Sequence, residues 1–190
     1  FNHSLVANIK TENKKTQISI KSKVATEYLK RWLELDLLSI MKGTLSYHAR
    51  VDLCPNKSCN KLVITSDLKG VEVSAPAPIG KGSADKLALT IVSDLGTRYN
   101  DERSVIRLNM GNQLRGVMVN KSDQVERARF SLGGKKPEIP AAKGIWVDGH
   151  LERLNYKELD RFLVDAGLTA SNNSQTASAG PSNPSNSALE

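Results

Sequence analysis

The sequence has no apolar run long enough to cross a bilayer as a helix, and only 5% of its 190 residues are aromatic. The longest candidate, Leu33 to Met41, contains Glu34 and Asp36 and falls well short of the roughly 18 unbroken apolar residues that a spanning helix needs. The chain opens at Phe1 without a signal segment, and its last two residues, 189 and 190, resemble a cloning scar. We therefore expect a non-spanning piece of a longer protein, whose export signal or membrane anchor lies elsewhere.

Catalytic motifs are also missing. The three histidines, His3, His48 and His150, lie far apart, and the last two occupy polar positions of alternating stretches, where a solvated side chain is the ordinary explanation. The stretch 78–83 resembles a phosphate loop, but Gly82 follows its lysine where serine or threonine is required. We predict that the chain is not an enzyme and holds no metal or cofactor; an enzyme that uses His48 or His150 is the weakest alternative.

The chain carries a net charge of +7 and has a pI near 9.4, which raises the question of a nucleic-acid partner. Lysine and arginine are spread along the sequence between acidic residues, and the dense pair Lys14 and Lys15 has no aromatic neighbours on which bases could stack. We therefore expect no nucleic-acid partner. An anionic membrane surface or lipid headgroup would use the same charge equally well.

The clearest pattern is the alternation of apolar and polar residues, best seen from Leu45 to Leu53. Such alternation predicts a strand with one face in solvent, and nine further stretches resemble it. Because the intervening turns are too short for crossover helices, the sequence predicts a mainly β fold in which ten strands form an antiparallel meander. The other predicted strands are Leu5–Ile9, Gln17–Lys23, Leu62–Ser66, Val71–Val73, Leu87–Val92, Val105–Met110, Leu114–Val119, Glu126–Leu132 and Ile145–Leu151.

Two short amphipathic helices are predicted beside the sheet. Thr26 can cap the first, in which apolar residues recur at helical spacing. The second begins with Asn155 as N-cap and Glu158 three residues later, the pattern of a capping box. The polar tail, 169–190, cannot bury enough apolar area to offset its ordering entropy and is predicted to be disordered, so the β fragment spans 1–168.

Ten strands that each carry an apolar row need more cover than two short helices provide. The sheet could close into a barrel, fold over as a sandwich, or remain a trough that accepts an apolar ligand. Small barrels and sandwiches usually have larger side chains inside, whereas the candidates here are mainly valine, isoleucine, leucine and alanine. About ten acyl-chain methylenes would contribute about 8 kcal/mol on burial before ordering costs, so a trough could hold lipid. A structural or adhesive β domain with a self-covered core is the alternative.

The two cysteines enclose a turn-forming segment between two predicted strands. Cys54 and Cys59 are separated by Pro-Asn-Lys-Ser. A hairpin-closing disulfide fits this spacing and would imply an oxidising compartment, although two free thiols remain an alternative. Zinc would need two more ligands, and only distant histidines are available.

One segment of the chain is similar to a known family. Residues 66–81 read Ser-Asp-Leu-Lys-Gly-Val-Glu-Val-Ser-Ala-Pro-Ala-Pro-Ile-Gly-Lys, which resembles a recurrent segment of the YhdP branch of the AsmA-like envelope proteins. The Gly-Thr-aromatic strand that precedes this segment in the family is matched by residues 43–47, and a downstream Gly-x-Leu-x-x-Leu is matched from Gly149. The resemblance covers roughly residues 1–167. Two features depart from the family pattern: Ala75 stands where leucine is usual, and the insert between the cysteines is not a family feature.

The resemblance implies a long curled sheet with an apolar inner groove, in a periplasmic protein that is anchored in the inner membrane of a Gram-negative cell. It further implies that phospholipid acyl chains are the ligand and that the role is phospholipid transport towards the outer membrane and maintenance of its barrier. The oligomeric state stays open. A plain core would use the same side chains, so only bound lipid separates the two interpretations. By this resemblance the groove is lined by Leu45, Tyr47, Ala49, Val51, Leu62, Ile64, Leu87, Leu89 and Ile91.

Overall fold

The computed structural model describes most of the chain up to residue 149 and two residues beyond it. The predicted second helix lies almost entirely outside the described residues, among which only 157 and 158 belong to it and are helical. The predicted disordered tail and two of the histidines, His3 and His150, also lie outside them. The described residues are 5–33, 39–55, 59–77, 79–95, 103–121, 124–149 and 157–158, without the side chains of 32 and 33.

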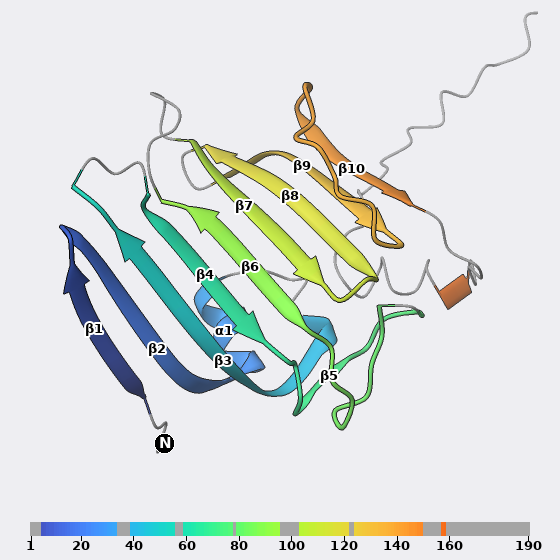
Figure 1. Ribbon diagram of the computed structural model, residues 1–190. Coiled ribbons are helices and arrows are strands. Elements are labelled where there is room, and N and C mark those ends of the chain that lie inside the picture. The colour runs from blue at the N-terminus through green and yellow to red at the C-terminus, as the bar shows by residue number, and fades with distance from the viewer. Residues whose placement is uncertain are drawn as a thin grey trace, which may run out of the picture.

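The fold is mainly β, as the alternation predicts. Nine strands follow one another across a single twisted sheet in the order β1-β2-β3-β4-β6-β7-β8-β9-β10, and β5 pairs with the start of β3 (Figure 1). Since β1 and β10 are the two edges of this path, the sheet is open. All ten predicted strands are confirmed, although β6 begins two residues later than predicted. The strands are β1 (Val6–Glu12), β2 (Lys15–Ala25), β3 (Met41–Leu53), β4 (Lys61–Ser66), β5 (Val71–Val73), β6 (Leu89–Asp94), β7 (Arg103–Met110), β8 (Leu114–Lys121), β9 (Gln124–Leu132) and β10 (Gly144–Gly149).

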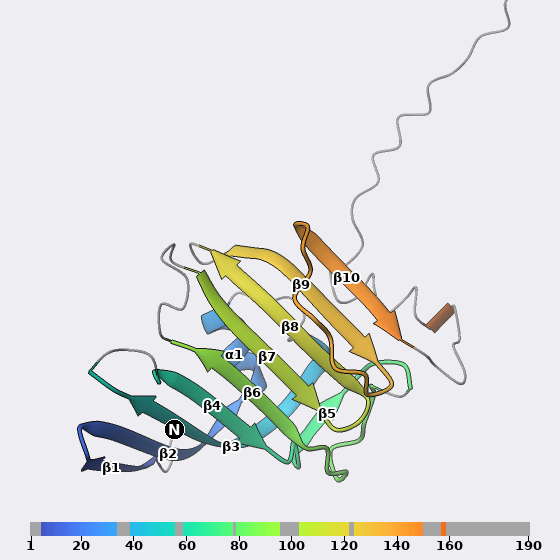
Figure 2. The ribbon, with the colours of Figure 1, turned by 45° about the horizontal axis from the view of Figure 1, so that its top comes forward.

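One pair of strands departs from the predicted antiparallel meander. β10 runs parallel to β9, whereas every other neighbouring pair in the sheet is antiparallel. The connection 133–143 therefore returns along the sheet before β10 begins, as Figure 2 shows in orange. Arg127 holds this connection, because its guanidinium donates hydrogen bonds of 3.1 Å to the carbonyls of Pro140 and Ala141. Alternation has the same period in both strand directions, so the sequence pattern could not reveal the reversal.

The first predicted helix is confirmed as α1 (Thr26–Leu33), which follows β2 directly. Thr26 is buried, and its hydroxyl donates a hydrogen bond of 3.2 Å to the carbonyl of Gly43 at the start of β3. Leu29 packs against the main core cluster. The helix thus lies behind the sheet in Figure 1 and covers part of one face.

The main core cluster gathers at one end of the sheet. Leu45 of β3 and Met110 of β7 meet Leu68, Val71 and Val73 there. The last three belong to residues 67–88, the segment that connects β4 to β6 in the sequence and is here called the lobe. The lobe contains β5 and folds back onto the sheet. Together, α1 and the lobe cover this end of the sheet.

Candidate lipid-binding face

The pairing register places apolar side chains in continuous rows on one face of the sheet, here called the apolar face. One row crosses all nine strands of the path, and its members are Ala7, Ile20, Ala49, Ile64, Ile91, Leu108, Gly116, Phe130 and Val147. Every member is hydrocarbon except Gly116, where an added Cβ would lie 2.8 Å from the Phe130 ring. The aromatic ring thus occupies the place that a side chain at 116 would take, and the row stays apolar throughout.

The opposite face, here called the polar face, carries the charged side chains of these strands. In the paired stretches of these nine strands, the lysine, arginine, aspartate and glutamate side chains lie on this face. Glu126 lies at a bulge, and its carboxylate contacts Arg103 on the same face. The basic members on the nine strands of the path are Lys10, Lys15, Lys21, Lys23, Lys42, Arg50, Lys61, Arg103, Arg107, Arg115, Lys121, Arg127 and Arg129. The acidic members are Glu12, Asp52, Asp94, Glu126 and Asp148. The two faces therefore offer entirely different chemistry.

The structure brings the predicted groove residues together on the apolar face, with one exception. Leu45 and Ala49 are buried, and the remaining strand residues of the set, Tyr47, Val51, Leu62, Ile64, Leu89 and Ile91, are half-buried. Leu87 precedes β6 instead of lying in it. Its backbone N–H donates to the carbonyl of Asp67, and its Cδ1 lies where a Cβ on Gly111 would be. Leu87 is therefore part of the lobe that covers one end of the face.

Apolar side chains on this face are more exposed at the sheet edges than at the end that the lobe covers. At one edge, Leu5 just before β1 and Ile9 on β1 are 62% and 69% exposed, and at the other, Ile145 and Val147 on β10 are 65% and 66% exposed. A sheet that buried its apolar side in a closed core would hide such residues. Among the described residues, cover for this face comes from α1 and the lobe at one end.

The lobe is held by Lys81. A lysine in a turn at a sheet edge is ordinarily solvated, but Lys81 is half-buried and its ammonium donates to the backbone carbonyls of Leu68, Val71 and Gly82. Its backbone also pairs with Val73, whose N–H and carbonyl bond to the carbonyl and N–H of Lys81. A lysine can satisfy three carbonyls at once because its ammonium has three donors.

Two glycines allow close backbone approaches, one between the sheet and the lobe and one within the lobe. Gly43 has φ +123°, and a Cβ there would lie 2.1 Å from the carbonyl oxygen of Gly70. A Cβ on Gly80 would lie 2.0 Å from the carbonyl oxygen of Ala75. Neither position has room for a side chain. The segment 66–81 and its upstream glycine thus form one structural unit that closes an end of the apolar face.

Comparison with protein-family models decides the family. The model described as YhdP protein matches residues 1–190. The chain belongs to the YhdP family. This is a family of envelope proteins. Comparisons with curated proteins and with solved structures find no match.

The polar face of this YhdP-family chain contains a small second cluster that the sequence did not suggest. Val105, Val117 and Val119 are at most 3% exposed, although they lie on the charged side of the sheet. Register places Val117 between Arg107 and Arg129. Arginine stems are long hydrocarbon chains that cover apolar neighbours while their guanidinium groups stay wet.

Ion pairs fix several of these arginines. Arg103 donates to Glu126 at 2.9 and 3.4 Å, and Arg127 and Lys143 each approach the same carboxylate at 3.7 Å. Partial burial raises the pKa of the Glu126 carboxyl, but the hydrogen bond from Arg103 and the three positive charges outweigh it, so this pKa lies below its ordinary value. Arg107 pairs with Asp94 at 3.1 Å.

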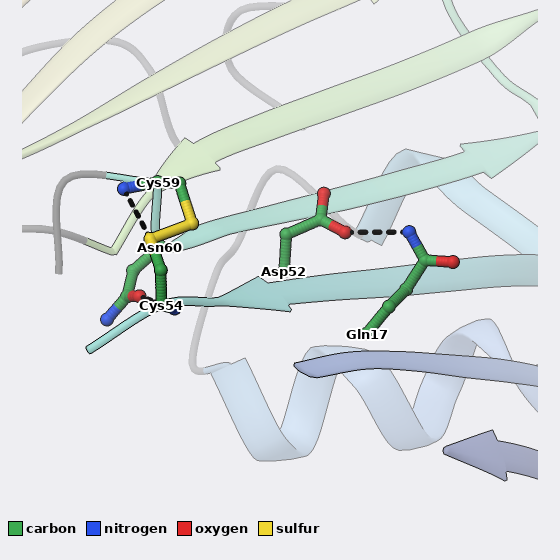
Figure 3. Close-up of a disulfide and its surroundings, with 5 residues drawn as sticks. All are labelled: Gln17, Asp52, Cys54, Cys59 and Asn60. Atoms are coloured by element: carbon green, nitrogen blue, oxygen red, sulfur yellow. Dashed lines mark hydrogen bonds between the residues drawn. A yellow bond between two sulfur atoms is a disulfide. The ribbon is translucent and has the colours of Figure 1, made fainter. Parts of the chain in front are cut away.

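The remaining predicted site residues lie away from the apolar face. Cys54 and Cys59 form a disulfide at the tip of the β3–β4 hairpin, where the Cys54 N–H donates to Asn60 Oδ1 at 2.9 Å (Figure 3). His48 lies on the polar face with Nε2 2.7 Å from Ser19 Oγ. No described helix is long and apolar enough to cross a membrane, and the described residues contain no group of three potential metal ligands.

Proposed function

We propose that this chain binds the acyl chains of phospholipids along its apolar face, without catalysing a reaction on them. In this proposal it is one part of a periplasmic, inner-membrane-anchored protein that moves phospholipid towards the outer membrane and so maintains the outer-membrane barrier. Membership of an envelope protein family supports this role. The disulfide between Cys54 and Cys59 supports an oxidising compartment such as the periplasm.

The observation that carries the proposal is the separation of the two faces. A row of hydrocarbon side chains crosses nine strands, from Ala7 to Val147, while the charged strand residues lie on the other side. Neighbouring strands lie about 4.8 Å apart, so this row is about 38 Å long. A continuous uncharged surface of that length suits an extended hydrocarbon chain, because such a ligand has no polar groups to satisfy along its length.

The energetics are sufficient for binding. Each methylene that leaves water contributes about 0.8 kcal/mol, so about ten methylenes on the apolar face contribute about 8 kcal/mol before the cost of ordering the chain. The row from Ala7 to Val147 contains no side chain that can form a hydrogen bond. We therefore expect affinity to depend on acyl chain length, and to depend little on the polar group at its end.

Displacement of a fluorescent fatty acid by phospholipid tests the proposal with a matched pair of variants on β6. Ile91 lies on the apolar face opposite Ile64, and Thr90 lies on the polar face opposite Thr65. Both positions are half-buried. Ile91→Glu places a carboxylate against the bound chain and should weaken binding at least about tenfold, whereas Thr90→Glu should leave it near the parent value.

Circular dichroism of both variants is the control for folding. Equal affinity of two folded variants would contradict the proposal, and so would failure of the parent chain to bind the fatty acid at all. A closed interior in a structural or adhesive β domain predicts the second of these results.

A further inference from the structure

We propose that the polar face is a docking surface for an anionic lipid bilayer, with the sheet lying on the headgroups and its apolar face turned away. The chain would then use its two faces for two different contacts with lipid. Because a sheet separates the two faces, a single lipid molecule cannot contact both. This inference is independent of acyl-chain binding, and either one can fail alone.

The charge of the polar face is the first argument. The nine strands of the path carry thirteen lysine and arginine side chains and five carboxylates on it, so an excess of positive charge faces one direction. Neutral or basic surfaces give no compensation for such an excess. Anionic headgroups do, and each lysine or arginine near them contributes about 1 kcal/mol to binding at moderate ionic strength.

The lysines on β2 are the second argument. Lys15, Lys21 and Lys23 are exposed and share the polar face of one long strand. None of them takes part in an ion pair among the residues that the structure describes. By contrast, Arg103 and Arg107 are half-buried and already bound to carboxylates. The arginines of β7–β9 therefore brace the sheet, and the lysines of β2 remain available to a partner.

The dispersed arrangement of these charges favours a bilayer over a folded acidic protein. The lysines follow one another along an extended strand, and Lys121 carries a further exposed positive charge on β8, beyond the sheet centre. Among the described residues, the exposed large apolar neighbour of these lysines is Val6, opposite Lys21, and no exposed aromatic residue of the kind that anchors most protein interfaces lies beside them. Mobile headgroups can rearrange to meet separated charges, whereas a rigid partner must present its carboxylates at matching positions.

Vesicle flotation with the full 190-residue chain tests this inference. We expect the chain to float with vesicles that contain phosphatidylglycerol, to stay behind with vesicles of phosphatidylcholine alone, and to dissociate from the anionic vesicles at high salt. The double variant Lys21→Glu/Lys23→Glu should weaken binding to anionic vesicles about 30-fold. The matched control Lys69→Glu/Lys86→Glu makes the same charge change in the lobe and should bind nearly as the parent does.

Three results would overturn the inference. Equal binding to neutral and anionic vesicles would mean that the apolar face makes the contact. Equal weakening by both double variants would mean that net charge alone matters. Failure to bind anionic vesicles, with retention on immobilised polyglutamate that depends on Lys21 and Lys23, would assign the surface to an acidic protein instead.

Discussion

Replacement of Lys81 by methionine should release the lobe from the sheet. Methionine keeps most of the aliphatic length of lysine but has no donor, so the carbonyls of Leu68, Val71 and Gly82 lose the ammonium they share. The backbone pairing of residue 81 with Val73 does not involve the side chain and stays possible. The substitution therefore isolates the contribution of one ammonium group.

The expected loss is about 3 kcal/mol. A hydrogen bond from a charged donor contributes about 1.5–3 kcal/mol, and three such bonds set the upper limit. Water can reach some of the released carbonyls, because Gly82 is exposed and Lys81 is half-buried, which lowers the sum. In a protein of this size, about 3 kcal/mol corresponds to a fall in Tm of about 6–12 °C.

Thermal unfolding and amide hydrogen exchange would measure the effect. The amides of Val71 and Val73, which bond to carbonyls within the lobe, should exchange faster in Lys81→Met. Lys86→Met is the control, since Lys86 is largely exposed and lies 4.0 Å from Asp67; surface changes of this kind stay within about 0.5 kcal/mol. If Lys81→Met unfolds at the same temperature as Lys86→Met, the lysine does not hold the lobe.

Further changes test other parts of the fold. Gly43→Ala should destabilise the chain by about 3 kcal/mol or more in urea titration, because Gly43 has a positive φ and the added Cβ would clash with the carbonyl of Gly70. Gly82→Ala is the control; its Cβ would meet only the side chain of Asp85, so it should cost far less. Glu126→Gln should lower stability at neutral pH. Since the pKa of Glu126 is depressed in the folded state, the loss of stability should be complete above pH about 4.5 and should vanish as the pH falls through the folded-state pKa. A loss of stability that persists in acid would contradict this. Reduction of Cys54 and Cys59 opens a short loop and should cost about 2 kcal/mol, with no effect of reductant on the double serine variant.

Strand positions could be predicted from the sequence because one face of each strand is wet. Alternation from Leu45 to Leu53 marks β3 clearly, and the same pattern marks the other nine strands. The direction of a strand could not be predicted in this way. β10 has the alternation of its neighbours, yet it runs parallel to β9 because of the connection 133–143, whose course depends on the hold of Arg127.

The apolar face could be predicted in the same way, but its cover could not. Ile64 and Ile91 meet across the sheet because register follows from alternation. Leu87 also fits the pattern of an inward residue; it precedes β6 and packs against the main core cluster at the covered end of the face. The burial of Val117 and the contacts of the Lys81 ammonium arise from tertiary packing, and no spacing in the sequence records either.

A photo-crosslinking amino acid placed on either face of β4 tests most directly whether the apolar face holds lipid. Ile64 is on the apolar face and Thr65 is on the polar face, and both are half-buried. After expression in a Gram-negative periplasm and irradiation, mass spectrometry should find a phospholipid adduct on the chain with the crosslinker at 64 and none at 65. Adducts at neither position, or in equal yield at both, would contradict the account.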